Sequence, residues 1–123
     1  MPVEYAIDHE KQTVVVRAHG AVVLDEVLSY FDALVVQDAM RYPKLFDARD
    51  VTTARLSDDD IMTLGARVSA YEAFEPRGPI AAVAATPEAV DVLRRFMNLG
   101  GAKRPMKLFA SLEQAEEWLA QQP

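Results

Sequence analysis

The feature that most constrains the fold is a continuous run of small apolar residues from Ile80 to Ala85. Its length suits a strand, but it lacks the polar alternation of a strand that faces water on one side. Such a strand is buried on both faces, so helices must cover both sides of its sheet. Thr86, Pro87 and Glu88 follow as a cap residue, a proline and an acid, which predicts that a helix begins directly after this strand.

The rest of the chain alternates between strand and helix patterns. Residues rich in β-formers predict further strands at 3–8, 12–20, 45–46 and 106–109. Apolar residues at helical spacing predict helices at 24–40, 58–71, 87–99 and 112–119. The order β-β-α-β-α-β-α-β-α predicts an α/β fold with a mostly parallel five-stranded sheet, an antiparallel first strand and helices on both faces. A length of 123 residues suits a single domain over 1–123.

Composition excludes several classes of protein. The net charge of -6 repels a polyphosphate backbone, so we expect no nucleic-acid partner. The chain has no cysteine, which excludes disulfides, zinc-thiolate sites and thiolate catalysis. The first residues form neither a basic leader nor an apolar signal segment, and no apolar run approaches the ~18 residues that span a bilayer. We therefore expect a cytoplasmic protein that is not transmembrane.

A polar stretch from 47 to 60 connects the third predicted strand to the second predicted helix. We interpret it as a loop after Asp47 that ends in a capping box, with Ser57 as the cap and Asp60 three residues later. The carboxyl end of a strand is the usual place for function in open α/β sheets. The candidate binding residues are Asp47, Arg49, Asp50, Ser57, Asp58 and Asp59. For Asp47, Arg49 and Asp50, the alternative is a local ion pair among themselves at the protein surface.

Two short motifs stand at the end of the third predicted strand and in the last predicted helix. They are Phe46, Asp47, Val51 and Thr52 in the first, and Ala115, Trp118 and Leu119 in the second. Together with the order of elements, they resemble the SpoIIAA-like branch of the STAS superfamily, the anti-sigma-factor-antagonist-like domains, over essentially the whole chain. The resemblance implies a non-enzymatic regulatory or interaction domain with a protein partner. That branch is also compared with lipid-carrying CRAL-TRIO domains.

Ser57 has two interpretations. In the anti-sigma-factor antagonists, the central strand is followed by Asp-Ser-Ser-Gly, and a serine of this motif is phosphorylated at the helix start. An ungapped match through Asp47 and Val51 places Arg55 to Asp58 at the motif, and only Ser57 is retained. The resemblance thus implies no intact phosphoserine switch. Ser57 is a helix cap in the first interpretation and a phosphoacceptor in the second, which the neighbouring carboxylates oppose.

A local excess of positive charge lies near the end of the chain. Its residues are Arg94, Arg95, Lys103, Arg104 and Lys107. They can bind an anionic group, or they can form a solvated helix end. Aromatic residues and methionines at helical spacing either fill the core or line an apolar pocket. They are Phe31, Phe74, Phe96, Met97, Met106 and Trp118. The second hypothesis is therefore a small carrier or sensor of an apolar or amphipathic, lipid-like ligand, whose polar end lies near Arg94, Arg95, Lys103 or Arg104.

The usual catalytic arrangements are incomplete. His9 and His19 are the only imidazoles, and no nucleophile elbow accompanies them. The acidic residues lack the alternating spacing and central glycine of a calcium loop. We therefore expect no enzyme activity, no metal and no cofactor. The oligomeric state is left open, with a homodimer as one option.

Overall fold

The structure is a computed structural model that describes residues 3–72, 78–99 and 106–122. Its elements confirm the predicted order. They are β1 (Val3–Asp8), β2 (Thr13–Val23), α1 (Leu24–Val36), β3 (Lys44–Arg55), α2 (Asp58–Glu72), β4 (Ile80–Ala84), α3 (Pro87–Leu99), β5 (Met106–Phe109) and α4 (Leu112–Ala120).

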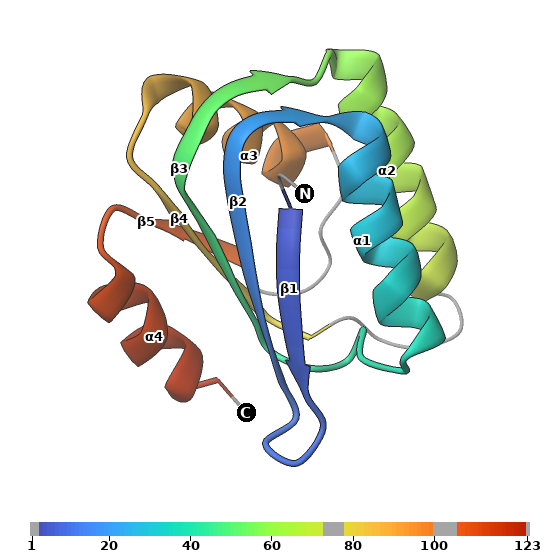
Figure 1. The fold of residues 1–123 in the computed structure, drawn as a ribbon, viewed down its shortest axis with the longest axis vertical. Coiled ribbons are helices and arrows are strands. Elements are labelled where there is room, and N and C mark those ends of the chain that lie inside the picture. Colours follow the sequence, from blue (N-terminus) through green and yellow to red (C-terminus); the bar gives the residue numbers. More distant parts are fainter. Residues whose placement is uncertain (1–2, 73–77, 100–105, 123) are drawn as a thin grey trace.

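The five strands form one sheet in the order β1-β2-β3-β4-β5. β1 is antiparallel to β2, and each later pair is parallel, as predicted. Helices α1, α2 and α3 pack on one face of the sheet, and α4 packs on the other (Figure 1). Parallel connections of this kind bring the carboxyl ends of β2, β3, β4 and β5 to one edge of the sheet.

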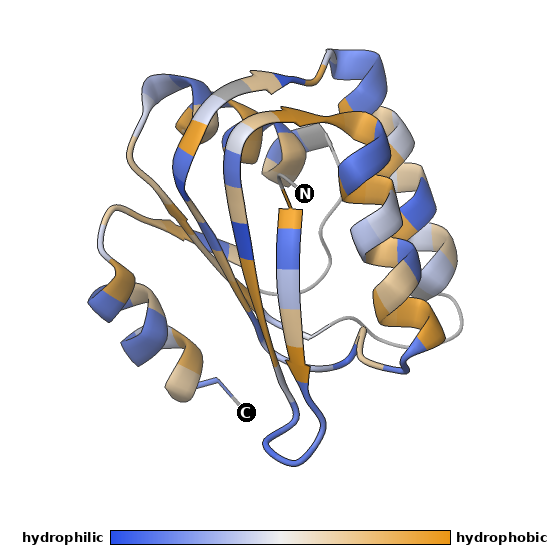
Figure 2. Ribbon diagram, viewed as in Figure 1, coloured by the Kyte–Doolittle hydropathy of each residue, from blue (hydrophilic) through white to orange (hydrophobic). Residues whose placement is uncertain are grey.

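The two faces of the sheet have separate cores. Every residue of β4 is buried, which confirms the strand predicted to be covered on both sides. Its Ala84 joins the larger core under α1, α2 and α3, whereas Ala81 and Val83 contact Ala115 of α4 in the smaller core. Hydrophilic and hydrophobic residues alternate around the helices, as expected for amphipathic helices (Figure 2). No helix within the described ranges is long and apolar enough to cross a membrane.

β3 differs most from its prediction. The loop predicted after Asp47 is wrong, because the strand continues to Arg55 and pairs with β2 along this length. The pairing shifts register twice, between Arg17 and His19 and between Gly20 and Ala21 of β2. At each shift β3 holds one more residue than β2, which is the arrangement of a β-bulge and bends the pair of strands over the helices (Figure 1).

Helix α1 ends earlier than predicted, at Val36 instead of near residue 40. Asp38 adopts a left-handed conformation with φ of 57°. The N–H of Ala39 donates to the carbonyl of Leu34 at 2.8 Å, and the N–H of Asp38 donates to that of Val35 at 3.1 Å. These two bonds form a Schellman motif with aspartate at the position that glycine usually takes. The sequence therefore carried no glycine signal for this helix end.

The amino ends of the central strands are held by backbone contacts. Lys44 is 1% exposed, and its ammonium donates to the carbonyls of Met40 and Tyr42 at 2.5 and 2.7 Å. Gly78 donates its N–H to the Met40 carbonyl at 2.9 Å. A Cβ at Gly78 would lie 2.4 Å from the Tyr42 carbonyl oxygen, so only glycine allows this approach.

A pair of substitutions in α1 tests the larger core. Leu34 is 0% exposed and Val36 is 85% exposed. We expect Leu34→Ala to lower the free energy of unfolding by about 3 kcal/mol, because it removes apolar contacts and leaves a cavity. Val36→Ala should change the same quantity by less than about 0.5 kcal/mol. Urea denaturation followed by circular dichroism measures both, and equal losses would contradict the assigned face of α1.

Candidate functional site

The first bulge of β3 gathers polar side chains on one face of the sheet. Phe46, Ala48 and Val51 pack into the larger core, whereas Asp47 and Asp50 lie on the opposite face. Side chains alternate along a strand, so two residues three positions apart normally face opposite sides. The extra residue at the bulge changes this alternation. It therefore allows both carboxylates to lie beside each other.

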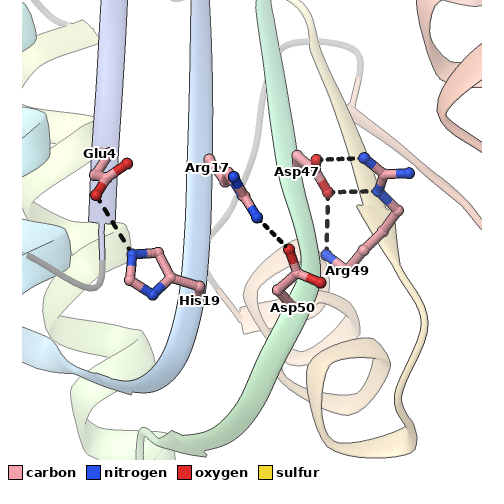
Figure 3. A network of polar contacts seen from close by, with 6 residues as sticks. All are labelled: Glu4, Arg17, His19, Asp47, Arg49 and Asp50. Carbon is pink, nitrogen blue, oxygen red and sulfur yellow. Dashed lines mark hydrogen bonds and ion pairs between the residues drawn. The ribbon is translucent and has the colours of Figure 1, made fainter.

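Three pairs of polar side chains lie on this face, two of them between neighbouring strands and one within β3 (Figure 3). We call their six residues the sheet-face cluster: Glu4, Arg17, His19, Asp47, Arg49 and Asp50. Arg49 donates from Nε to Oδ1 of Asp47 at 2.9 Å and from Nη2 to Oδ2 at 2.8 Å, and its backbone N–H also donates to Oδ1 at 3.1 Å. Arg17 donates to Asp50 at 2.7 Å, and His19 Nε2 lies 3.5 Å from Glu4 Oε1.

Each aspartate of the sheet-face cluster has an arginine partner. Hydrogen bonds from Arg49 lower the pKa of Asp47, whose side chain is only 13% exposed. The hydrogen bond to Asp50 raises the pKa of Arg17. The other side chains are well exposed, and exposed pairs contribute little to stability. The local ion pair, which was the alternative interpretation of Asp47, Arg49 and Asp50, is present between Asp47 and Arg49, whereas Asp50 pairs with Arg17 of β2.

Ser57 caps helix α2, as the first interpretation predicted. Its Oγ accepts from the N–H of Asp60 at 3.1 Å, and Asp60 Oδ2 accepts from the N–H of Ser57 at 3.0 Å. Asp58 accepts from Arg95 of α3 at 2.9 Å, and Arg95 also donates to Asp91 at 3.0 Å. The hydrogen bond to Asp58 raises the pKa of Arg95. This arginine therefore ties the first turn of α2 to α3.

The candidate residues lie on two surfaces. Asp47, Arg49 and Asp50 belong to the sheet-face cluster, on the face away from α2. Ser57, Asp58 and Asp59 lie exposed at the start of α2, which packs on the other face through Ile61 and Leu64.

Met62 is a residue that sequence reasoning missed. Its side chain is 57% exposed, one turn after Asp58 and Asp59. The sequence contained a signal for this exposure. Ile61 and Leu64 lie at the helical spacing of residues that face the core, and Met62 does not share that spacing. We call the exposed group of Ser57, Asp58, Asp59 and Met62 the α2-start surface.

The basic residues predicted near the end of the chain have different surroundings in the structure. Arg95 is engaged by two carboxylates, whereas Arg94 is exposed and makes no hydrogen bond or ion pair with any residue that the structure describes. The Lys107 ammonium lies 5.5 Å from the centroid of the Phe109 ring. Lys103 and Arg104 lie outside the described residues.

Arg94 borders a surface groove of about 290 Å³ between α3 and β5. Its lining residues are Ala84, Val90, Arg94, Met97, Leu108, Phe109 and Ala110. A second cavity of about 90 Å³ lies between the sheet and α1, α2 and α3, and is lined mainly by apolar residues such as Val22, Ala54 and Phe96. The sequence did not indicate the groove, because its lining comes from three separate segments, α3, the end of β4 and the end of β5.

Both histidines contact neighbouring polar side chains. His9 Nδ1 lies 2.9 Å from the Tyr42 hydroxyl, and His19 faces Glu4. Among the described residues, no group of three or more histidine, cysteine, aspartate or glutamate side chains is placed to hold a metal ion.

Solved structures identify the fold. The anti-sigma factor antagonist SpoIIAA in its unphosphorylated form is 15% identical, with a TM-score of 0.60 and 96% of each chain covered. An anti-sigma factor antagonist from Mycobacterium paratuberculosis is 14% identical, with a TM-score of 0.59 over 97% of this chain and 95% of that one. A Shewanella loihica protein with a SpoIIAA-like fold is 15% identical, with a TM-score of 0.58 over 95% and 93%. The chain has a SpoIIAA-like fold.

This SpoIIAA-like fold confirms the resemblance found in the sequence and extends over nearly the whole chain. At this level of identity, the likeness concerns the fold. No protein-family model matches the sequence, and no curated protein matches it.

The capping box can be tested at Ser57. We expect Ser57→Ala to lower the free energy of unfolding by about 1 kcal/mol, because the N–H of Asp60 loses its acceptor. Ser57→Asn should retain most of the stability, since an asparagine side chain also caps a helix. Urea denaturation measures both variants. If the alanine variant were as stable as the asparagine variant, the hydroxyl would not act as the cap.

The pair between Asp47 and Arg49 predicts a pH dependence. The folded chain holds the pKa of Asp47 below its ordinary value of 3.8, so the stabilisation is present above that value and is lost as the pH falls through the lowered one. Between about pH 5 and pH 2, the free energy of unfolding should fall more steeply for the wild type than for Asp47→Asn. Urea denaturation across this range provides the slopes.

Arg49→Gln is the matched control for that experiment. It removes the same pair from the other side, so it should flatten the slope to a similar extent, and the double variant should add no further change. Equal slopes for the wild type and Asp47→Asn would contradict the role of this pair.

Proposed function

We propose that the chain is a non-enzymatic regulatory domain that binds a protein partner through the α2-start surface. The fold supports this proposal, because two proteins of similar fold are anti-sigma factor antagonists by name. Incomplete catalytic arrangements in the sequence agree with a role in recognition. In this proposal, binding of the domain alters the activity of its partner.

The observation that carries the proposal is the exposure of Met62 beside Asp58 and Asp59. A methionine on the outer face of a helix contributes nothing to the core. Methionine is frequent at binding surfaces because its side chain adapts to the partner. An apolar anchor surrounded by a polar rim is the usual arrangement of a protein interface. The partner surface should therefore offer an apolar pocket with basic residues at its rim.

The contacts around the α2-start surface hold it in place. Ser57 and Asp60 cap the helix, and Arg95 fixes Asp58 from the neighbouring α3. A surface that is ordered before binding loses less conformational entropy when the partner arrives. Phosphorylation of Ser57 is not required by this proposal. Phosphorylation of Ser57 stays a prediction. The other motif positions hold Arg55, Leu56 and Asp58, which differ from the motif and argue against a phosphoserine switch.

A second candidate function is the carriage of a small apolar or amphipathic ligand, which the cavity between the sheet and α1, α2 and α3 supports. Its volume of about 90 Å³ is below the roughly 300 Å³ at which pockets for drug-sized ligands begin. A lipid-sized ligand would therefore need the helices to move away from the sheet. Native mass spectrometry of the purified chain tests this candidate, since a carrier should retain a lipid-sized adduct.

Affinity capture from a lysate of the source organism tests the main proposal. Quantitative mass spectrometry should find one protein that the wild type enriches and that Met62→Glu loses by about tenfold or more, because a buried charge would replace the apolar anchor. Val36→Glu is the matched control, since it places the same charge at an exposed apolar residue of α1. It should retain the partner.

Circular dichroism must show that both variants are folded. A partner that binds Met62→Glu as well as it binds the wild type would exclude the α2-start surface. A lipid-sized adduct together with no captured protein would favour the carrier.

A further inference from the structure

The groove beside β5 has the form of a site for an extended chain. Val90, Arg94 and Met97 lie four and three residues apart along α3, so they form one stripe of the helix. Leu108, Phe109 and Ala110 line the opposite side from the last residues of β5 and the position after it, together with Ala84 at the end of β4. The groove therefore runs between a helix and a strand.

β5 is the last strand of the sheet. It pairs with β4 on one side, and the sheet order places no described strand on its other side. The backbone N–H and C=O groups along such an edge can pair with an added strand. Several domains bind extended peptides in this way, with backbone hydrogen bonds for affinity and pockets for alternate side chains. The free edge of β5 offers the backbone groups, and the groove at the carboxyl ends of β4 and β5 offers a pocket for a side chain.

Charge selects the kind of peptide. Arg94 is exposed at the groove and has no carboxylate partner among the described residues, whereas Arg95 next to it has two. The other lining residues of the groove are apolar. A guanidinium beside an apolar surface fits a carboxylate that accompanies apolar side chains. The groove is thus complementary to an acidic and apolar segment.

We infer that the groove between α3 and β5 binds an extended acidic segment of a partner protein, which adds to the edge of β5 as a further strand. An acidic side chain pairs with Arg94, and an apolar side chain enters between Met97 and Leu108. A small carboxylate ligand would leave the edge of β5 unused, and the groove of about 290 Å³ is open at the surface. The inference rests on α3 and β5 and is independent of the α2-start surface.

A library of 12-residue peptides displayed on phage provides the probe, with the full chain as bait. We expect enrichment of peptides in which an acidic residue and apolar residues alternate. The best synthetic peptide should bind about tenfold or more weakly to Arg94→Glu, which repels the acid, and to Ala110→Trp, which fills the groove. In NMR spectra of the wild type, the peptide should shift the amide signals of residues 107–110 and protect them from hydrogen exchange.

Lys11→Glu is the matched control, since it makes the same change of charge in the exposed turn between β1 and β2. It should bind the peptide as the wild type does. Failure to enrich any acidic peptide would overturn the inference. So would peptides that Arg94→Glu and Ala110→Trp still bind while Met62→Glu does not, because these would occupy the α2-start surface. Binding of decanoate at Arg94 without any peptide binding would also overturn it, in favour of a small-molecule site.

Discussion

Burial of β4 between two layers of helices is the constraint on which the rest of the structure depends. A strand without polar residues has to be covered on both faces, so the chain places three helices on one side and α4 on the other. The parallel connections then align the carboxyl ends of the central strands. The start of α2 follows the carboxyl end of β3, and the groove lies at the carboxyl end of β5, so both proposed surfaces belong to this edge of the sheet (Figure 1).

The sequence predicted the elements whose signals are local. The apolar run at 80–85 and the helical spacing of the four helices are properties of neighbouring residues, and the structure has these elements in the predicted order. The end of α1 was predicted too late because Asp38 replaces the usual glycine of a helix end. The length of β3 was missed for another reason. Its polar residues stay in the strand because β2 provides pairing partners, and a partner strand is not visible in the local pattern.

The same distinction applies to the candidate site. Ser57 and Asp60 are three residues apart, and Asp47 and Arg49 are two apart, so their contacts follow from the local sequence. The pairs that join distant segments could not be derived in this way. Arg17 reaches Asp50 across 33 positions, and Arg95 reaches Asp58 across 37. The exposure of Met62 was within reach of the sequence, because its position is out of phase with the buried residues of α2.

The two bulges of β3 also determine how this chain should be aligned with its structural relatives. In a relative that lacks one of these bulges, the cap of the second helix would follow the start of the strand by one residue fewer. Counting forward from the start of the strand would then match Ser57 to the wrong position of the relative. Superposition should therefore be anchored on the helix cap itself, where the hydrogen bonds between Ser57 and Asp60 identify the equivalent residue regardless of strand length.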